Sequence, residues 1–228
     1  MAISVFLPVR KGSERIKNKN TRKFSVFEGG LLELKLLQLK EVEGIEEIIL
    51  STNDEDCWEV GERFKNSIPR LRIEQRPDDL GRAETNLQDL IKHAGELSNS
   101  EDILWTHVTS PLFNAANYEN AVKKYANIQK PGYDSLISGT KYRDFLIDKD
   151  TGVLVNNHGR LEWPRTQDLA DWFEVDNAVF ITSASNFRNG KRTGKNPYLF
   201  ENNRINAIDV DYEEDFLIAE AVYERIYR

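Results

Sequence analysis

Short apolar runs alternate along this chain with longer segments in which apolar residues recur at helical spacing. The apolar runs predict strands, which fall at 3–9, 47–52, 71–75, 103–108, 178–181 and 205–209. The segments with helical spacing predict amphipathic helices, which fall at 31–42, 55–65, 87–97, 114–128 and 213–227. Strands that alternate with helices of this length predict an α/β fold with a mostly parallel sheet covered on both faces.

Residues 139–176 interrupt this alternation. They contain turn signals at 150–152 and 156–159, short strand-like pieces, and two tryptophans, Trp163 and Trp172. We interpret them as an inserted β-rich excursion, an arm or dimerisation element, within a single domain that spans residues 1–228.

A loop rich in lysine and arginine follows the first predicted strand, from Arg10 to Asn20. Ligands of open parallel sheets bind beyond the carboxyl ends of the strands, where this loop lies. Glycine at position 12 allows close backbone approach, and the cations would neutralise phosphate charge, so the loop predicts a triphosphate site. The alternative is a solvated basic turn. The whole chain is acidic, with 38 acidic and 31 basic residues and a net charge of −7. A cluster of cations is unusual in such a chain, which favours the triphosphate site over the basic turn.

The composition narrows the class of protein. An acidic chain disfavours general nucleic-acid binding, which depends on a broad basic surface. A single cysteine, Cys57, permits no internal disulfide, and its acidic neighbours indicate a structural thiol. The apolar run at 3–9 is too short to span a bilayer, and the start of the chain does not look like a signal peptide. We therefore expect a cytoplasmic enzyme without membrane or nucleic-acid partners.

Two carboxylates, Asp209 and Asp211, lie at the end of the last predicted strand. Residues two apart in a strand point to the same side, and Mg²⁺ accepts a few carboxylates together with water and phosphate oxygens. The pair therefore predicts a magnesium site. In the alternative interpretation, Asp211 is the N-cap of the acidic helix start that follows.

Two further positions follow predicted strands. Arg76, in Arg76-Pro77, would contact a nucleotide base or phosphate, unless the segment is an ordinary surface turn. His107 precedes the hydroxyls of Thr109 and Ser110 at the end of a central strand. A histidine at such a position is more often a packed, hydrogen-bonded residue than a general base.

Six ordered motifs carry a family resemblance over nearly the whole chain. The opening motif comprises Arg10, Gly12, Ser13, Arg15, Lys19 and Asn20; the others are Ser51–Asp54, Arg76–Leu80, Thr109–Leu112, Asn177–Ile181 and Ile208–Asp215. In this order they resemble the cytidylyltransferases that activate sugar acids, the CMP-sialic acid synthetase (N-acylneuraminate cytidylyltransferase) and CMP-Kdo synthetase family.

The resemblance implies a Rossmann-like three-layer α/β/α nucleotidyltransferase domain that forms a homodimer, in which the arm reaches the partner's active site. It implies that the anomeric hydroxyl of a 2-keto sugar acid attacks the α-phosphorus of CTP. The catalytic residues would be Arg10, Lys19 and Asp211, and Mg²⁺ would bind Asp209 and Asp211. The nucleotide would contact Arg10, Gly12, Ser13, Lys19, Asn20, Arg76, Thr85 and His107.

The chain departs from the family pattern mainly at the sugar side. His107 replaces a glutamine, Phe113 replaces a frequent arginine, and Glu174 stands where sialic acid enzymes carry an arginine. Arg165 does match a substrate-side arginine. Candidates for binding the acid are thus Arg165, Lys141 and Arg143, although the last two also fit a solvated turn. Two alternatives stay open: a nucleotidyltransferase with another acceptor, such as Kdo, a sugar phosphate or a phosphonate, and a non-catalytic nucleotide-binding homologue.

Overall fold

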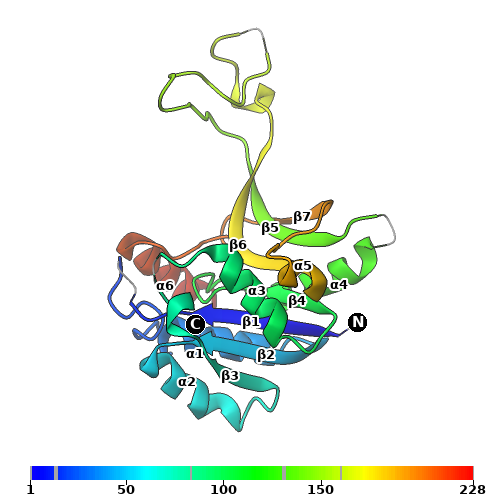
Figure 1. Ribbon diagram of the computed structural model, residues 1–228. Helices are drawn as coiled ribbons and strands as arrows, with labels where there is room; N and C mark the ends of the chain where they lie inside the picture. Colours follow the sequence, from blue (N-terminus) through cyan, green and yellow to red (C-terminus); the bar gives the residue numbers. More distant parts are fainter. Residues whose placement is uncertain (1, 13–14, 83, 130–131, 160, 228) are drawn as a thin grey trace.

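The computed structural model describes residues 2–12, 15–82, 84–129, 132–159 and 161–227. They form a seven-stranded sheet in the order β3-β2-β1-β4-β6-β5-β7 (Figure 1). Strand β6 runs antiparallel to both of its neighbours, and the other pairings are parallel. The predicted mostly parallel sheet is therefore confirmed, with one internal strand, β6, antiparallel to the others.

The strands are β1 (Ile3–Val9), β2 (Ile45–Thr52), β3 (Leu71–Gln75), β4 (Asp102–Trp105), β5 (Ser135–Tyr142), β6 (Trp172–Ser183) and β7 (Pro197–Asn202). The helices are α1 (Gly30–Lys40), α2 (Glu55–Lys65), α3 (Leu87–Leu97), α4 (Ala115–Ile128), α5 (Ala184–Arg188) and α6 (Glu213–Tyr227), with short 3-10 turns at Asp78–Leu80 and Thr166–Asp168.

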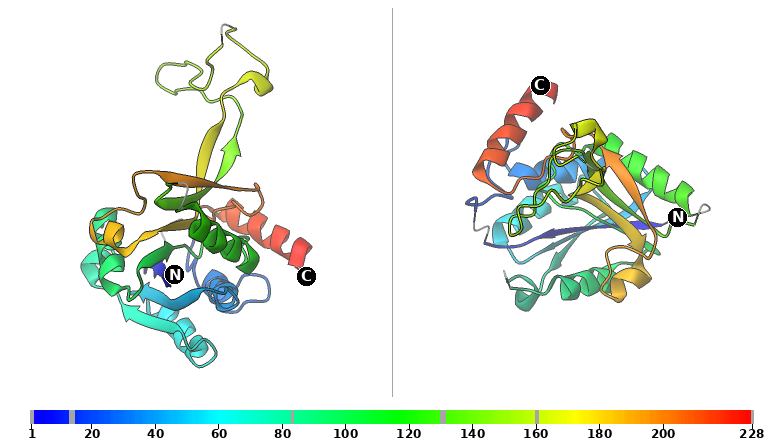
Figure 2. Two further views of the ribbon diagram at one scale, coloured as in Figure 1. Left: turned by 90° about the vertical axis from the view of Figure 1, so that its right-hand side faces the viewer. Right: turned by 90° about the horizontal axis from the view of Figure 1, so that it is seen from above.

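Two apolar clusters pack on opposite faces of the sheet, because successive side chains of a strand point to opposite sides. In β1, Val5 and Leu7 belong to the larger cluster, whereas Phe6 belongs to the smaller one. Helices α1, α2, α4 and α6 contribute to the larger cluster, and α3 and α5 to the smaller. The helical layers on the two sides of the sheet are visible in Figure 2. This is the predicted three-layer α/β/α arrangement.

Helix α1 is more deeply buried than its pattern predicts. An amphipathic helix should keep a polar face in water, yet Lys35 and Gln38 are buried along with the leucines. The Lys35 ammonium donates hydrogen bonds to the carbonyl oxygens of Ser110 and Phe113, at 2.9 and 3.3 Å, and to the Tyr118 hydroxyl at 2.7 Å. Burial lowers its pKa. The lysine thus fixes the loop that follows β4.

The predicted last strand at 205–209 is wrong. Residues 204–207 form a turn, in which the Ala207 N–H donates to the Asn203 carbonyl. The edge strand is β7, which pairs with β5 and begins at a proline, a residue that edge strands tolerate. Asn203 and Asn206 favour a turn over a strand at this place.

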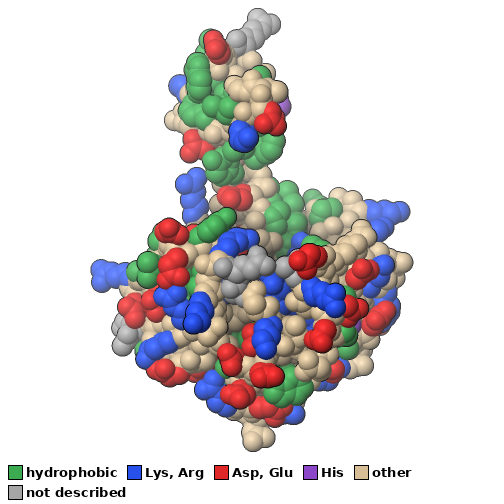
Figure 3. Space-filling model, turned by 60° about the vertical axis from the view of Figure 1, so that its left-hand side comes forward, with side chains coloured by type: hydrophobic (Ala, Val, Ile, Leu, Met, Phe, Trp, Pro, Cys, Tyr) green, Lys and Arg blue, Asp and Glu red, His purple; other side chains and the backbone are tan. Residues whose placement is uncertain are grey.

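Strands β5 and β6 extend beyond the body of the sheet and carry a projecting segment, residues 143–171, which we call the arm (Figure 1). Beyond the paired strand ends, the arm contains an isolated bridge between Ile147 and Leu154 and one 3-10 turn. Leu161 and Trp163 are 67% and 64% exposed, and Figure 3 shows hydrophobic side chains gathered on the arm. Its role in dimerisation stays a prediction.

Helix α2 begins as predicted. The Asp54 carboxylate accepts a hydrogen bond from the Asp56 N–H at 3.0 Å and so caps the helix. Cys57, in its first turn, is buried, and burial raises the pKa of its thiol, which suits a structural cysteine. Within the described ranges, no helix combines the length and apolar character needed to cross a membrane.

Candidate functional site

The basic loop after β1 folds back on the ends of β1 and β2. Gly12 has a φ of +79°, a left-handed conformation that favours glycine. The Asn20 side-chain amide donates to the Arg10 carbonyl at 3.4 Å, and the Lys11 N–H donates to Asn53 Oδ1 at 3.0 Å. The loop is therefore tied to the sheet edge. Ser13, which the opening motif includes, lies outside the described residues.

A cavity of about 240 Å³ opens at the carboxyl ends of β1 and β4. It brings together five residues of the predicted nucleotide set: Arg10, Lys19, Asn20, Arg76 and His107. Its other walls are mainly apolar and include Pro8, Val9, Leu87, Leu90, Trp105 and Val108. An apolar wall facing a cluster of cations suits a ligand that has a flat base at one end and phosphates at the other.

Arg76 is not part of a surface turn. Its side chain is 2% exposed, and its guanidinium donates to the Ser51 carbonyl oxygen at 2.6 Å and to the Ser51 hydroxyl at 3.3 Å. Burial, reinforced by the nearby charge of Arg10, lowers the Arg76 pKa to about 10. The guanidinium therefore stays charged at neutral pH, and β2 holds it against the cavity.

His107 lines the cavity as a neutral, hydrogen-bonded ring. The Trp105 indole N–H donates to its Nε2 at 2.8 Å, which leaves the ring proton on Nδ1. Burial among surrounding atoms lowers the His107 pKa to about 3, and the charges of Arg192 and Lys19 add to this effect. The ring nevertheless keeps part of its surface accessible through the cavity. It can donate one hydrogen bond to a ligand and is unsuited to serve as a general base.

Thr85 is not brought to this cavity. Its hydroxyl donates to the Asp79 carbonyl at 2.8 Å, and the residue is half-buried in the segment before α3. Among the described residues, α3 reaches the cavity through Leu87 and Leu90 instead.

Lys19 connects the cavity to the two aspartates. Its ammonium donates to the Val210 carbonyl at 2.7 Å and lies 3.7 Å from Asp211 Oδ1, while Arg15 lies 3.3 Å from Asp211 Oδ2. Burial lowers the Lys19 pKa, although Asp211 and Asp209 oppose the shift.

The alternative interpretation made Asp211 the N-cap of α6, but it is the carboxylate of Asp215, in the first turn, that bonds backbone N–H groups where the helix begins. Asp215 Oδ2 accepts hydrogen bonds from the N–H groups of Asp211 and Tyr212, at 3.0 and 2.8 Å. The Asp211 carboxylate instead pairs with the two cations described above.

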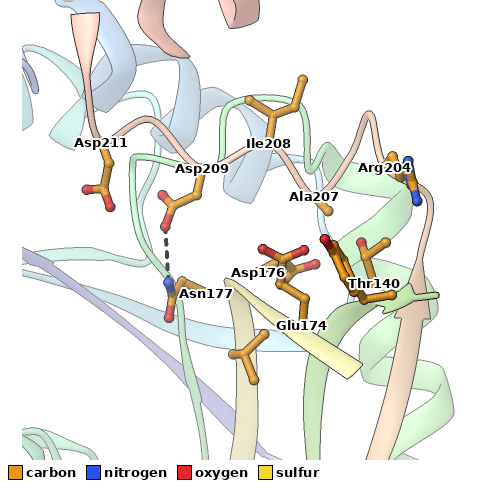
Figure 4. A pocket seen from close by; sticks show the side chains of 11 residues that line it. Thr140, Glu174, Asp176, Asn177, Arg204, Ala207, Ile208, Asp209 and Asp211 are labelled. Carbon is orange, nitrogen blue, oxygen red and sulfur yellow. Dashed lines mark hydrogen bonds between the residues drawn. The ribbon is translucent and has the colours of Figure 1, made fainter. Parts of the chain in front are cut away.

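Asp209 has one oxygen with a partner and one without. Oδ2 accepts from the Asn177 amide at 3.0 Å (Figure 4), whereas Oδ1 is buried and finds no hydrogen-bond partner among the described residues. Burial raises the Asp209 pKa. Asn177 adopts a φ of +58°, a left-handed conformation that asparagine tolerates.

A metal ion at this place would need ligands from outside the protein. The described residues contain no group of three or more histidine, cysteine or acidic side chains arranged to hold a metal. Mg²⁺, however, usually binds one or two carboxylates together with water and substrate phosphates. The unpartnered oxygen of Asp209, next to Asp211, fits that donor set.

A second cavity, of about 510 Å³, begins at the same two aspartates (Figure 4). It lies between the ends of β5 and β6 and the loop that leads to Asp211. Four carboxylates line it, and the single cation among its described lining residues is Arg204; the carboxylates are Glu174, Asp176, Asp209 and Asp211. The two cavities thus differ in charge. They adjoin where Lys19, which lines the first, lies 3.7 Å from Asp211, which lines the second.

The predicted acid-binding residues do not line this cavity: Arg143 and Arg165 lie on the arm, and Lys141 lies near the end of β5. Lys141 lies 2.5 Å from the Asp171 carboxylate, to which Arg143 also donates. Arg165 pairs with Asp168 at 2.9 Å. Among the described residues, none of the three lines the second cavity of its own chain.

Sequence reasoning missed Asn177 as a partner of Asp209, and it missed Thr140 and Arg204 as lining residues. Asn177 could have been identified from the sequence, because it is the first residue of one of the family motifs. The position of Thr140 depends on the pairing of β5 with β6, which no local pattern specifies.

No protein-family model matches the chain. Among curated proteins, it is 22% identical to "Post-translational flagellin modification protein B" of Campylobacter coli, over 92% of this chain and 90% of that protein. It is 26% identical to a pseudaminic acid cytidylyltransferase of Campylobacter jejuni, over 77% and 75% of the two chains. It is 24% identical to the CMP-N,N'-diacetyllegionaminic acid synthase of Legionella pneumophila, over 98% and 97%.

Solved structures share the fold. A CMP:2-keto-3-deoxy-manno-octonic acid synthetase complexed with CTP superposes with a TM-score of 0.69 at 10% identity, over 99% of both chains. The 4-diphosphocytidyl-2C-methyl-D-erythritol synthase of Anaerococcus prevotii superposes with a TM-score of 0.63 at 15% identity, over 98% and 96%. Together with the curated relatives, these similarities confirm the resemblance to the sialic-acid-type cytidylyltransferase family that the sequence motifs predict.

Proposed function

We propose that this protein is a CTP-dependent cytidylyltransferase that transfers CMP to a 2-keto sugar acid, N-acylneuraminate or a related nonulosonic acid. The observation that carries this function is that two oppositely charged cavities adjoin: Lys19, which lines the cationic one, lies 3.7 Å from Asp211, which lines the acidic one. One cavity is cationic and suits a triphosphate, and the other has the size and polarity of a sugar site. The named relatives include transferases for pseudaminic and legionaminic acids.

In the nucleotide cavity, Arg10 and Lys19 would bind the triphosphate, while Gly12, Asn20 and the undescribed Ser13 would orient it. Arg76, held by Ser51, and the Nδ1–H of His107 line the same cavity and would contact the nucleotide. Fixed donors of this kind stabilise the charge that develops during phosphoryl transfer without having to reorganise.

The reaction exchanges one phosphorus–oxygen bond for another. The anomeric hydroxyl oxygen of the acid forms a bond to the α-phosphorus of CTP, and the bond from that phosphorus to the bridging oxygen of the β-phosphate breaks. Pyrophosphate leaves with the bonding electrons, and the hydroxyl proton passes to solvent. Lys19 would stabilise the negative charge on the leaving group, because its ammonium lies at the junction of the two cavities.

Asp209 and Asp211 would hold Mg²⁺ with oxygens from water and the nucleotide, and the ion would supply charge neutralisation and a lower pKa for the attacking hydroxyl. Arg15 and Lys19 form ion pairs with the Asp211 carboxylate. Binding of a triphosphate would attract both cations and so free Asp211 for the metal.

We further propose a homodimer in which the arm of one subunit completes the sugar site of the other. This would bring Lys141, Arg143 and Arg165 to an acceptor that they do not reach within one chain. The exposed apolar side chains of the arm support an interface there. We place the enzyme in the cytoplasm, where CTP is made.

The alternative acceptors differ in how they fit the second cavity. A sugar phosphate or phosphonate would bring a dianion among the carboxylates of the cavity, which disfavours it on electrostatic grounds. A sugar acid brings a single charge, beside the Mg²⁺ site. A non-catalytic homologue would bind CTP and show no turnover.

The direct test is release of pyrophosphate from CTP and Mg²⁺ with a panel of acids: N-acetylneuraminate, Kdo, pseudaminic acid and N,N'-diacetyllegionaminic acid. We expect release with at least one nonulosonic acid and loss of activity when EDTA removes the metal. A folded, dimeric protein that binds CTP but releases no pyrophosphate with any acid would contradict the proposal. Replacing CTP with ATP, GTP or UTP controls for the nucleotide.

A further inference from the structure

The second cavity contains a buried polar atom that neither the fold nor the metal site explains. The Thr140 side chain is 8% exposed, and its hydroxyl oxygen has no hydrogen-bond partner among the described residues. The other such atom in the cavity is Asp209 Oδ1, which lies across it from Thr140 in Figure 4. A buried polar group without a partner is costly, which suggests that a ligand supplies one at each place.

The strand register sets Glu174 beside Thr140. The two residues are direct partners in the antiparallel pairing of β5 with β6, so their side chains leave the same face of the sheet. Glu174 is exposed in the cavity and has no ion-pair partner in the described part of the chain. Figure 4 shows both side chains at the cavity.

The neighbouring carboxylate is already occupied by the protein. Asp176 accepts hydrogen bonds from the Ser138 hydroxyl, the Ala178 N–H and the Asn202 amide, at 2.5, 3.0 and 2.9 Å. Glu174 is therefore the carboxylate that remains free for a ligand at this end, and an ionised carboxylate only accepts hydrogen bonds.

We propose that Thr140 and Glu174 form the subsite for the part of the acceptor that is remote from its anomeric hydroxyl, and that they select N–H and O–H donors there. This inference rests on the proposed function, because the reacting hydroxyl must lie near Asp209 and Asp211. Glu174 then favours an acceptor whose remote end carries hydroxyl, amino or acylamino groups, and it rejects one with a second anionic group there. Arg204, exposed at the rim, faces solvent as well as the cavity.

Two nearly isosteric variants test the subsite: Thr140→Val removes the hydroxyl, and Glu174→Gln removes the charge. For Glu174→Gln we expect kcat/KM for the acceptor to fall about 10- to 100-fold, since hydrogen bonds to charged groups contribute on this scale. For Thr140→Val we expect a fall of about 3- to 10-fold, because a hydrogen bond between neutral groups contributes less. The KM for CTP should change less than about twofold. The matched control is Glu201→Gln, an exposed glutamate on the neighbouring strand β7, which should behave as wild type.

Thermal unfolding separates a binding role from a purely structural one. Removal of a hydroxyl that has no partner in the protein should leave the unfolding temperature of Thr140→Val unchanged or raise it. If both variants keep the wild-type acceptor KM, the subsite proposal is overturned even though the enzyme is active.

Failure of the proposed function would look different, because the wild-type protein itself would release no pyrophosphate with any acid. In that event, calorimetric titration of the same acids into the CTP-bound protein still decides the subsite. Weaker binding to the two variants supports it, and equal binding or no binding to the wild type overturns it.

Discussion

The two cavities, which adjoin where Lys19 lies beside Asp211, are built in different ways. In the nucleotide cavity, cations are held by the protein itself: Arg76 by Ser51, and Lys19 by the Val210 carbonyl and Asp211. In the acceptor cavity, Thr140 Oγ1 and Asp209 Oδ1 have no hydrogen-bond partner among the described residues, and the three predicted acid-binding cations do not line it. A preorganised nucleotide cavity suits CTP, the substrate that cytidylyltransferases share. An acceptor cavity with unpartnered polar atoms suits the sugar acid, the substrate that differs between them.

The largest effect should come from the junction of the two cavities. We expect Asp211→Asn and Lys19→Met each to lower kcat about 100- to 1000-fold, because each removes a charge that acts on the transferring phosphate. Pyrophosphate release under saturating CTP measures this. The control is Glu213→Gln, an exposed partner of Arg22 at the start of α6. Wild-type turnover by Asp211→Asn at ordinary Mg²⁺ concentrations would show that the metal site is placed wrongly.

The next effect separates the nucleotide half from the acceptor half. Arg76→Met should raise the KM for CTP about tenfold or more and leave the acceptor KM nearly unchanged. It should also lower the free energy of unfolding by about 1–3 kcal/mol, because the Ser51 carbonyl loses a charged donor. Urea unfolding and initial rates test the two effects separately. Arg82→Met, an exposed neighbour, serves as control, and an equal rise in both KM values would remove the distinction between the halves.

A smaller effect should come from the arm. Arg165→Ala should raise the acceptor KM several-fold without changing the KM for CTP, if the arm of one subunit completes the site of its partner. Lys149→Ala, at the exposed arm tip, is the control. Sedimentation should show a dimer for both variants. A wild-type monomer that is fully active would contradict the proposed role of the arm.

The smallest effect concerns His107 and appears in stability. Its pKa is about 3 in the folded protein, against an ordinary value of 6.5. Between these values the unfolded chain binds more protons, so the free energy of unfolding falls as the pH drops from about 6.5 toward 3. His107→Gln, which can still accept from the Trp105 N–H, should flatten this part of the profile. Parallel profiles for the two proteins would show that His107 titrates normally.

Strand and helix positions that depend on local pattern were predictable. The apolar run at Ile3–Val9, the Asp54 cap of α2 and the extent of α6 all agree with the structure. Errors occurred where local pattern is ambiguous. The isoleucines at 205 and 208 suggested a strand, but the turn there forms because Val210 bonds to Thr109 and β7 takes the edge of the sheet.

The candidate site shows the same division. The motifs located Arg10, Lys19, Arg76 and Asp211 in the chain, because phosphate binding needs cations after strands and Mg²⁺ needs carboxylates. Their convergence was expected from the parallel order of β1, β2 and β4. By contrast, Thr85 was placed by motif alone, and the structure puts it outside the cavity lining that is described.

The sequence by itself determined the α/β class and the positions of the basic loop and of the two aspartates, since these depend on residue type and short spacing. Only the tertiary structure decided that Lys19 lies beside Asp211, that Ser51 holds Arg76, and that Thr140 faces the acceptor cavity beside Glu174. Each of these depends on contacts between groups that chain folding brings together, and local propensity carries no information about such contacts.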